Sequence, residues 1–311
     1  MEAKTKDNDI VVSILCAAYN HEEFISDALD SFLKQKTNFA FEIIVNEDCS
    51  TDSTASILKR YEKEYPNIVR VIYQKENQYS KGISVLDIMV SYSRGKYIAT
   101  CEGDDYWVDE LKLQKQVDYM EMHPDCSLVG HANYVVSKQK EIIKLRRDCP
   151  ENSEVNLITD GGYMHFATRL AKREVYTTLP RELHKKYYQG VAYIYYAHLL
   201  GYLFYDGNPM SVWRVNDNSV THSLYLGSQK SIDIYRDYLS FYKRFDSFSQ
   251  YRYHKSILLR ESEQIVELVL KARRYLPRSV FKELKKEESF KIAPLRIKAY
   301  ITLMSFLKTK N

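Results

Sequence analysis

The chain has 311 residues, 45% of them hydrophobic and 28% charged, which is the composition of an ordinary globular protein of one large or two medium-sized domains. Its five cysteines form no CxxC pair, which argues against a zinc site or a disulfide framework, and no apolar run reaches the ~18 residues of a membrane-spanning helix. The net charge of +4 divides unevenly: residues 1–226 carry 26 Lys+Arg against 32 Asp+Glu, or −6, and residues 227–311 carry 19 against 9, or +10.

Short apolar segments alternate with helical patterns over the first hundred residues. Strands are predicted at 11–17, 41–45, 69–73 and from Tyr97 onward. Asn20 and Glu23 form a capping box that predicts a helix start, and Gly95 is the predicted left-handed cap of a helix over 83–94. This β-α-β order predicts a parallel, doubly wound sheet with right-handed crossovers.

Acidic side chains follow two of these strands. Glu47 and Asp48 end the second, and Glu102, Asp104 and Asp105 end the fourth. One interpretation is that Asp104 or Asp105 caps a helix beginning near Asp109. However, the carboxyl ends of parallel strands share one edge of a sheet, where ligands bind, and a divalent cation relieves the repulsion between clustered carboxylates. The two acidic strand ends therefore favour a nucleotide and metal site, and the absence of GxGxxG and P-loop motifs implies that side chains and a metal hold the nucleotide.

Three segments then resemble a known family. Cys16-Ala-Ala-Tyr-Asn20, the stretch 42–52 and Glu102-Gly-Asp-Asp105 are similar to motifs of the family-two glycosyltransferases of the bacterial cell-surface polysaccharide type. The resemblance is strong over 10–137, weaker over 155–223 and ends at about 225. It implies a GT-A fold, with a Rossmann-like, mostly parallel central sheet flanked by helices, and transfer of a sugar from a nucleotide diphosphate donor with inversion.

This resemblance implies a division into domains. A GT-A glycosyltransferase domain is expected over residues 1–225, with a nucleotide-sugar-binding half at 10–137 and an acceptor half at 138–225. A basic helical C-terminal region is expected over 226–311.

The resemblance also implies roles for residues of the donor half. Ala18 and Tyr19 would line the base, and Asp48 would hydrogen-bond its edge. Asp104 would ligate the Mg²⁺ or Mn²⁺ ion that bridges the diphosphate, while Glu102, in place of the usual Asp, would contact the ribose, a metal-bound water or the metal itself. The implied nucleotide-sugar-binding residues are Ala17, Ala18, Tyr19, Asn20, Glu22, Asp48, Lys81, Glu102, Gly103 and Asp104, of which Lys81 has an equal alternative as a solvated surface lysine.

The acceptor half departs from the family at one position. The family has a Gly-Asp whose carboxylate is the general base, whereas this chain has Gln189-Gly190-Val191, which cannot accept a proton. Three accounts stay open: another carboxylate serves, the protein binds a donor but catalyses poorly, or a residue has been lost from an otherwise active sequence. The candidate replacement bases are Asp160, Glu182 and Asp206; His165 is a further candidate, and His222 is another, beside the diphosphate or as a metal ligand.

The last third of the chain has helical patterns and no strand pattern. Residues 291–308 are apolar with basic flanks, as in segments that lie in a membrane interface with anionic lipid. The alternative is packing on the catalytic body or on a second copy, which we expect for 229–275, whereas membrane contact is expected for 291–310. No nucleic-acid-binding module accompanies the basic tail.

The expected function is that of a metal-dependent inverting hexosyltransferase. It would use a nucleotide-diphosphate sugar, a UDP-sugar by expectation, and a glycan or lipid-linked acceptor in capsule, exopolysaccharide or cell-wall polysaccharide synthesis. The alternative is a catalytically weak homologue that serves as a nucleotide-sugar-binding or assembly partner. Since the amino terminus lacks the apolar core of a signal peptide, a cytoplasmic location is expected, peripheral at the inner face of the plasma membrane, with a homo-oligomer among the open partners.

Overall fold

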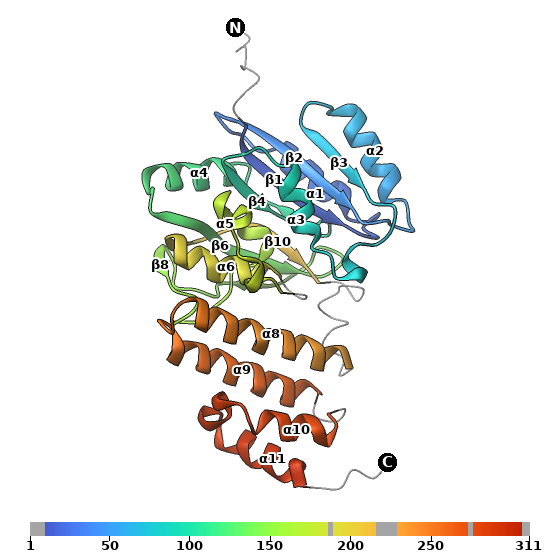
Figure 1. Ribbon diagram of the computed structural model, residues 1–311. Helices are drawn as coiled ribbons and strands as arrows, with labels where there is room; N and C mark the ends of the chain where they lie inside the picture. The colour runs from blue at the N-terminus through green and yellow to red at the C-terminus, as the bar shows by residue number, and fades with distance from the viewer. Residues whose placement is uncertain (1–9, 186–188, 216–228, 273–275, 307–311) are drawn as a thin grey trace. The chain divides into compact units, whose positions relative to one another are not determined.

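A computed structural model describes residues 10–185, 189–215, 229–272 and 276–306 of the protein (Figure 1). The chain divides into two compact units. The first, called here the sheet unit, comprises residues 1–157, 162–179 and 189–215. The second, called here the helical unit, comprises residues 158–161, 180–188 and 216–311.

The four N-terminal strands form the parallel half of the sheet, as predicted. They are β1 (Ile10–Ala18), β2 (Ala40–Glu47), β3 (Val69–Tyr73) and β4 (Tyr97–Thr100), in the order β3-β2-β1-β4. Ile14 and Ile43, at the centre of this sheet, have no exposed surface. Burial on both faces explains why β1, β2 and β4 appear in the sequence as nearly continuous apolar runs, whereas β3 at the edge is exposed at Arg70 and Tyr73.

The rest of the sheet combines parallel and antiparallel pairs. β9 (Leu170–Lys172) lies between β4 and β6 (Cys126–Val136), antiparallel to both, and β10 (Tyr202–Arg214) is parallel to β6. The antiparallel edges are β5 (Tyr106–Trp107) and β8 (Ser153–Val155) on β10, and β7 (Ile142–Arg146) on β6. The result is the mixed α/β architecture of the expected GT-A fold, and it brings the end of β10 beside the segment that follows β4.

Helices cover the sheet (Figure 1). They are α1 (Ile25–Leu33), α2 (Thr54–Glu64), α3 (Val85–Tyr92), α4 (Lys112–Met122), α5 (Glu174–Thr177) and α6 (Gln189–Leu200), with short 3-10 turns η1 (Tyr79–Lys81) and η2 (Phe166–Thr168).

Two predicted helix ends are wrong. Asn20 does not cap α1, which begins at Ile25 after Phe24 without a side-chain cap; its Oδ1 instead accepts a hydrogen bond from Thr51 N (2.8 Å). Gly95 is not a left-handed cap either, because α3 ends at Ser93 in an extended conformation. The glycine is needed for close approach: a Cβ at this position would lie 2.5 Å from Ser13 N.

The helical unit has its own apolar core. Its elements are η3 (Arg181–Leu183), α8 (Gln229–Phe248), α9 (His254–Ala272), α10 (Arg278–Leu284), η4 (Glu288–Ile292) and α11 (Leu295–Phe306). Ile232, Ile265, Phe281 and Ile301 bring four of these helices into one cluster. None of the helices in the described residues is long and apolar enough to cross a membrane.

Candidate active site

The acidic segment after β4, here called the acid turn (residues 102–105), is attached to the carboxyl end of β1. Gly103 N donates to Ala17 O (2.9 Å), and a Cβ at Gly103 would lie 2.8 Å from both His21 Nδ1 and Ile25 Cδ1. The acid turn does not cap a helix, because α4 begins at Lys112. The interpretation of these acids as helix caps is therefore wrong, and they lie at the edge of the sheet where ligands bind in open α/β folds.

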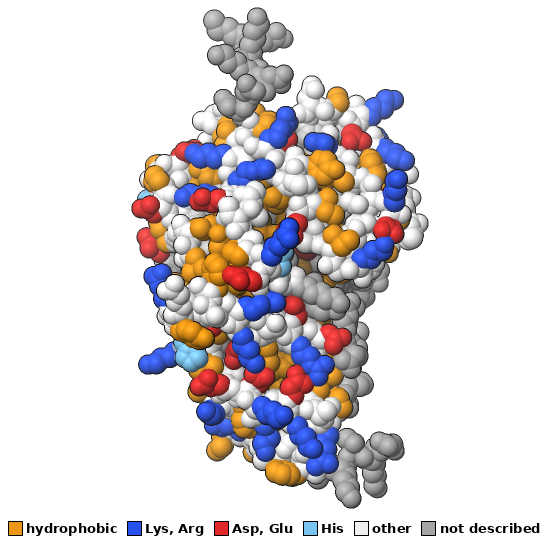
Figure 2. Space-filling model, in the orientation of Figure 1, with side chains coloured by type: hydrophobic (Ala, Val, Ile, Leu, Met, Phe, Trp, Pro, Cys, Tyr) orange, Lys and Arg blue, Asp and Glu red, His pale blue; other side chains and the backbone are white. Residues whose placement is uncertain are grey.

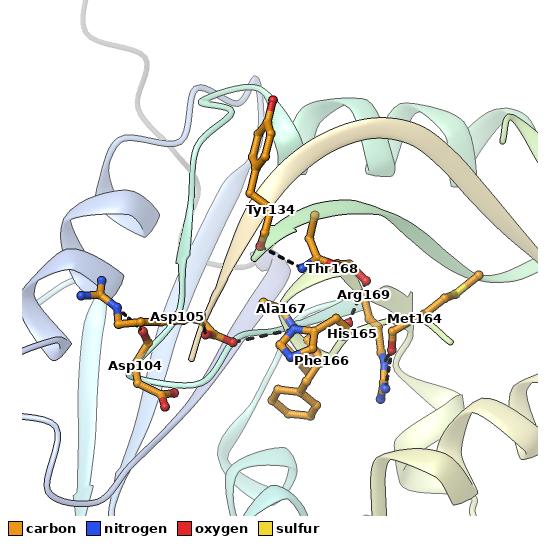
Figure 3. Close-up of polar contacts among 12 residues, drawn as sticks. Asp104, Asp105, Tyr134, Met164, His165, Phe166, Ala167, Thr168 and Arg169 are labelled. Carbon is orange, nitrogen blue, oxygen red and sulfur yellow. Dashed lines mark hydrogen bonds and ion pairs between the residues drawn. The ribbon is translucent and has the colours of Figure 1, made fainter. Parts of the chain in front are cut away.

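Asp104 and Asp105 leave the acid turn in different directions (Figure 3). Asp104 Oδ2 lies 4.0 Å from His21 Nε2. Asp105 is 1% exposed and faces His165, with Oδ2 at 3.7 Å from His165 Nδ1. Asp105 Oδ1 accepts a hydrogen bond from Arg214 N (2.9 Å), whereas Oδ2 is buried and has no hydrogen-bond partner among the described residues. Such an unsatisfied buried oxygen is costly unless something binds it.

Glu102, Asp105 and His165 form a cluster, each with one ligand atom within 4.8 Å of the others. Burial, followed by the charges of Asp104 and Glu102, raises the pKa of Asp105 well above its usual range. Desolvation of the carboxyl group by surrounding protein groups, and then the charge of Asp104, raise the pKa of Glu102 to about 7. The residue as a whole still has exposed surface. A positive charge bound at the cluster would favour the ionised forms of both carboxyl groups.

The imidazole of His165 is held as a neutral ligand. Burial, and then the charges of Arg146 and Arg169, lower the pKa of His165 to about 3. Its Nδ1 accepts a hydrogen bond from Ala167 N (3.3 Å), which orients the ring with Nδ1 3.7 Å from Asp105 Oδ2. Two carboxylates, one of them with the unsatisfied oxygen, and a neutral imidazole fit a divalent cation. The carboxylates suit Mg²⁺ or Mn²⁺.

A layer of rings and guanidinium groups holds His165 in place. Its ring stacks on Trp213 of β10 (centroids 5.1 Å apart) and meets the edge of Tyr163 (6.3 Å). Arg146 of β7 lies over both, with Cζ 5.4 Å from the Trp213 centroid and 4.9 Å from that of Tyr163. The sequence analysis missed Arg146, because no motif marks it and only the pairing of β7 with β6 brings it here. Tyr163 lies in the stretch 160–168, which resembles a family segment, but no role was assigned to it.

Arg214 connects β10 to the acid turn. This side chain is 2% exposed; its Nε donates to Asp104 O (3.0 Å) and its Nη2 to Asp27 Oδ2 (2.8 Å). Together with the bond from Arg214 N to Asp105, these contacts fix the acid turn from the opposite side to β1. Hydrogen bonds between charged groups are among the stronger ones in proteins.

The expected base-binding residues gather at the ends of β1 and β2. Asp48 N donates to Ala18 O (2.9 Å), which places the two residues together as the resemblance implied. The Asp48 carboxylate accepts hydrogen bonds from Gln78 N (2.9 Å) and Tyr79 N (3.0 Å), so it also orders the loop that precedes Lys81. Lys81 itself is exposed and forms an ion pair with Glu76.

The loops after β1 and β2 are joined by reciprocal hydrogen bonds. Glu22 N donates to Asp52 Oδ2 (3.1 Å), and Ser53 N donates to Glu22 Oε2 (2.9 Å). Next to this pair Asn20 holds Thr51, and Tyr19 is 43% exposed at the beginning of the same loop. Tyr19 therefore offers a free ring face, whereas Asn20 and Glu22 position the loop.

The candidate general bases are dispersed. Asp206 pairs in register with His131, and Arg214 with Val136, so Asp206 lies roughly 16 Å along the strands from the acid turn contacts. Asp160 and Glu182 belong to the helical unit. His222, the remaining candidate, lies outside the described residues.

Gly190, which with Val191 is one of the two positions that the resemblance implies for the family's base, lies beside an arginine. Arg169 is 3% exposed and donates from Nη1 to Gly190 O (3.1 Å), and from Nε and Nη2 to Met164 O (2.9 and 2.6 Å). A Cβ at Gly190 would lie 2.7 Å from Arg169 Nη1. A guanidinium group therefore stands where an aspartate side chain would point.

Curated relatives match part of the chain. The family described as "Glycosyl transferase family 2" matches residues 13–180. An uncharacterized protein of Mycobacterium bovis is 42% identical over 125 residues, 40% of this chain and 36% of that protein. The Escherichia coli "UDP-Glc:alpha-D-GlcNAc-diphosphoundecaprenol beta-1,3-glucosyltransferase WfaP" is 31% identical over 141 residues, 45% of this chain and 53% of that protein. The alignments thus span between about a third and a half of these relatives.

Solved structures share the fold over nearly the whole chain. The structure of S. aureus TarS (residues 1–349) in complex with UDP-GlcNAc superposes with a TM-score of 0.69 at 15% identity, covering 95% of this chain and 88% of that one. The mannosyltransferase PcManGT from Pyrobaculum calidifontis, in complex with GDP-Man and Mn²⁺, gives a TM-score of 0.51 at 13% identity, covering 97% and 88%. The GT-A fold is thus confirmed, and because the family match spans more than half of its residues, the chain belongs to glycosyl transferase family 2.

Proposed function

We propose that the protein is a metal-dependent, inverting glycosyltransferase that moves a sugar from a nucleotide-diphosphate sugar to a glycan or lipid-linked acceptor in cell-surface polysaccharide synthesis. The observation that carries this proposal is the Glu102–Asp105–His165 cluster at the carboxyl edge of the sheet in a family 2 chain. A UDP-sugar is the proposed donor, since TarS was solved with UDP-GlcNAc and WfaP is named for UDP-Glc. The name of WfaP also supports a lipid-linked acceptor and hence a peripheral place at the membrane.

In this proposal Glu102, Asp105 and His165 hold Mg²⁺ or Mn²⁺. Asp104, whose carboxylate lies 4.0 Å from His21 Nε2, is the further ligand that the family resemblance implies. Bound there, the ion would supply positive charge that stabilises the nucleoside diphosphate leaving group. Ala18 and Tyr19 would receive the base, with Ala17 and Gly103 as the neighbouring backbone. Arg214 would keep the acid turn in its binding geometry through the contact with Asp104 O.

The test is donor binding measured with and without metal. Calorimetric titration of the full chain with UDP and with a panel of nucleotide sugars should show binding in Mn²⁺ that is lost in chelator and in Asp104→Ala. Asp118→Ala, an exposed aspartate on α4, is the matched control and should bind as the wild type does. Donor affinity that ignores both the chelator and Asp104→Ala would overturn the proposal.

A second candidate is a catalytically weak homologue that binds a nucleotide sugar and serves as an assembly partner. The observation favouring it is Arg169 at Gly190, where a base is expected. Asp160 and Glu182 remain the carboxylates that we propose to test as replacement bases. Tight metal-dependent binding without transfer to any acceptor, and without hydrolysis of the donor, would favour this candidate; loss of turnover in Asp160→Asn or Glu182→Gln would favour the enzyme.

A further inference from the structure

Helix α11 is apolar on two sides, and the described residues cover one of them. Ile301 is fully buried, and Ile297, Tyr300 and Met304 pack against the core of the helical unit. This side explains why the helix folds onto α10. The other side has no such explanation.

The uncovered side forms a stripe of exposed apolar residues. Leu295, Leu303 and Phe306 are 79%, 57% and 68% exposed, and Ile292, just before the helix, is 50% exposed. Leu295, Leu303 and Phe306 are eight and three residues apart, which keeps them on one face of α11, and Ile292 ends η4 just before this helix. Four large side chains exposed to this degree present on the order of 400 Å² of apolar surface, the size of patches that mark interaction sites.

Basic residues surround this stripe, here called the α11 face (Ile292, Leu295, Leu303 and Phe306). Lys291 and Arg296 are exposed at its N-terminal end, and Lys285 Nζ lies 4.7 Å from the Phe306 ring centroid. Figure 2 shows Lys and Arg side chains gathered around hydrophobic ones over α10 and α11.

Nearby acids are directed elsewhere. Glu283 forms an ion pair with Arg236 (2.7 Å), and Glu287 with Lys243 (2.7 Å), both on α8. These pairs neutralise two of the three glutamates in residues 278–306, and Glu288 is the third. The rim of the α11 face is therefore positively charged.

We infer that the α11 face binds the surface of an anionic lipid membrane. Exposed Leu, Ile and Phe side chains enter the boundary between headgroups and acyl chains, while surrounding Lys and Arg side chains meet lipid phosphates. A second copy of the chain fits less well, because two such faces would oppose their basic rims and bury only about half of the ~800 Å² per partner of a stable interface. The inference rests on the peripheral place at the membrane that the proposed function includes and names the surface responsible, but vesicle binding itself requires no catalysis.

Vesicle co-sedimentation of the full chain tests the inference. The probes are vesicles of phosphatidylcholine alone and of an equimolar mixture with phosphatidylglycerol. The wild type should bind the mixed vesicles at least about tenfold more tightly, with binding weakened by salt. Leu295→Glu/Leu303→Glu should lose about tenfold or more of that affinity because two apolar contacts become repelled charges. Lys291→Gln/Arg296→Gln should lose most of the preference for anionic vesicles.

The matched control is Leu259→Glu, which places the same charge at an exposed leucine of α9 and should bind as the wild type does. All substituted side chains are exposed, so thermal melting should be unchanged and loss of binding cannot be ascribed to unfolding. Equal vesicle binding by Leu295→Glu/Leu303→Glu and the wild type would overturn the inference. So would a wild-type dimer in light scattering that Leu295→Glu/Leu303→Glu converts to a monomer, because a second copy would then be the occupant.

Discussion

Asp104 and Asp105 are adjacent in the sequence, but their side chains face different partners in the structure. The motif Glu102-Gly-Asp-Asp105 predicted an acidic cluster, and the structure places one at that position. It did not predict that Asp105 faces Glu102 and His165, while Asp104 lies beside His21. The direction of each side chain in the acid turn depends on the turn's backbone, which Asp105 N closes on Glu102 O. His165 is sixty residues away, so only the folded sheet determines which carboxylate joins the imidazole.

Asp105→Asn is predicted to abolish metal binding without lowering the stability of the metal-free protein. Without metal the variant should melt at the wild-type temperature or above, because a buried carboxyl group whose pKa is raised well above its usual range is replaced by a neutral amide. The increase in melting temperature that Mn²⁺ causes in the wild type should be lost. Differential scanning fluorimetry with Mn²⁺ and with chelator measures both effects. Asp118→Asn is the control, and a full Mn²⁺ response in Asp105→Asn would contradict the assignment.

Gly190→Asp is predicted to raise turnover. The new carboxylate would lie against Arg169, since even a Cβ would approach Nη1 to 2.7 Å, and the guanidinium would keep it ionised. A general base is commonly worth 10²–10⁴-fold, and an imperfectly placed one should give at least about tenfold. Release of nucleoside diphosphate from the donor measures the rate, with Gly190→Asn as the control of matched shape. Equal rates in these two variants would show that a base at this position adds nothing.

At the scale of elements, the strands were predictable and the loops between them were not. Val69–Tyr73 was predicted to the residue, because Val69 and Val71 alternate with Arg70 and point to the buried face of the sheet. The start of α1 was misplaced by several residues, since Asn20 holds Thr51 of the next loop instead of capping its own helix. Such cross-loop bonds depend on which strands are neighbours. Arg146 could not be predicted for the same reason, because it reaches the site only through the pairing of β7 with β6.

Asp48 is predicted to stabilise the loop before η1. Both of its oxygens accept backbone hydrogen bonds, from Gln78 and Tyr79, and an amide in Asp48→Asn can accept only one of them while presenting a donor to the other. Hydrogen bonds to charged groups are worth about 1.5–3 kcal/mol, so amide exchange of residues 78–79 should accelerate by about tenfold or more. Hydrogen exchange followed by mass spectrometry measures this change. Asp118→Asn should leave the loop unchanged, and slow exchange in Asp48→Asn would contradict the assigned role.

At the scale of the whole molecule, the C-terminal third has an excess of basic residues, yet it buries an acidic side chain, Glu261. Glu261 of α9 is 3% exposed and lies in the helical unit near Asp246 and Glu287. Desolvation by burial raises its pKa to about 7, against the lowering effects of Ser289 and then of Lys243. The helical unit therefore folds around a carboxyl group that is protonated at mildly acidic pH.

Glu261→Gln is predicted to remove a pH dependence of stability. The folded pKa of about 7 lies above the unfolded value of 4.5, so the folded chain binds more protons between these values and wild-type stability falls as pH rises from about 4.5 to 7. Above pH 7 the ionised, buried carboxylate costs at most about 3 kcal/mol, which Glu261→Gln avoids, whereas near pH 4.5 the two proteins should be alike. Urea unfolding at pH 5 and pH 8 measures the difference. Glu288→Gln, at an exposed glutamate, should follow the wild type at both pH values. Equal stability of Glu261→Gln and wild type at pH 8 would mean that the carboxylate has a compensating partner in the folded helical unit.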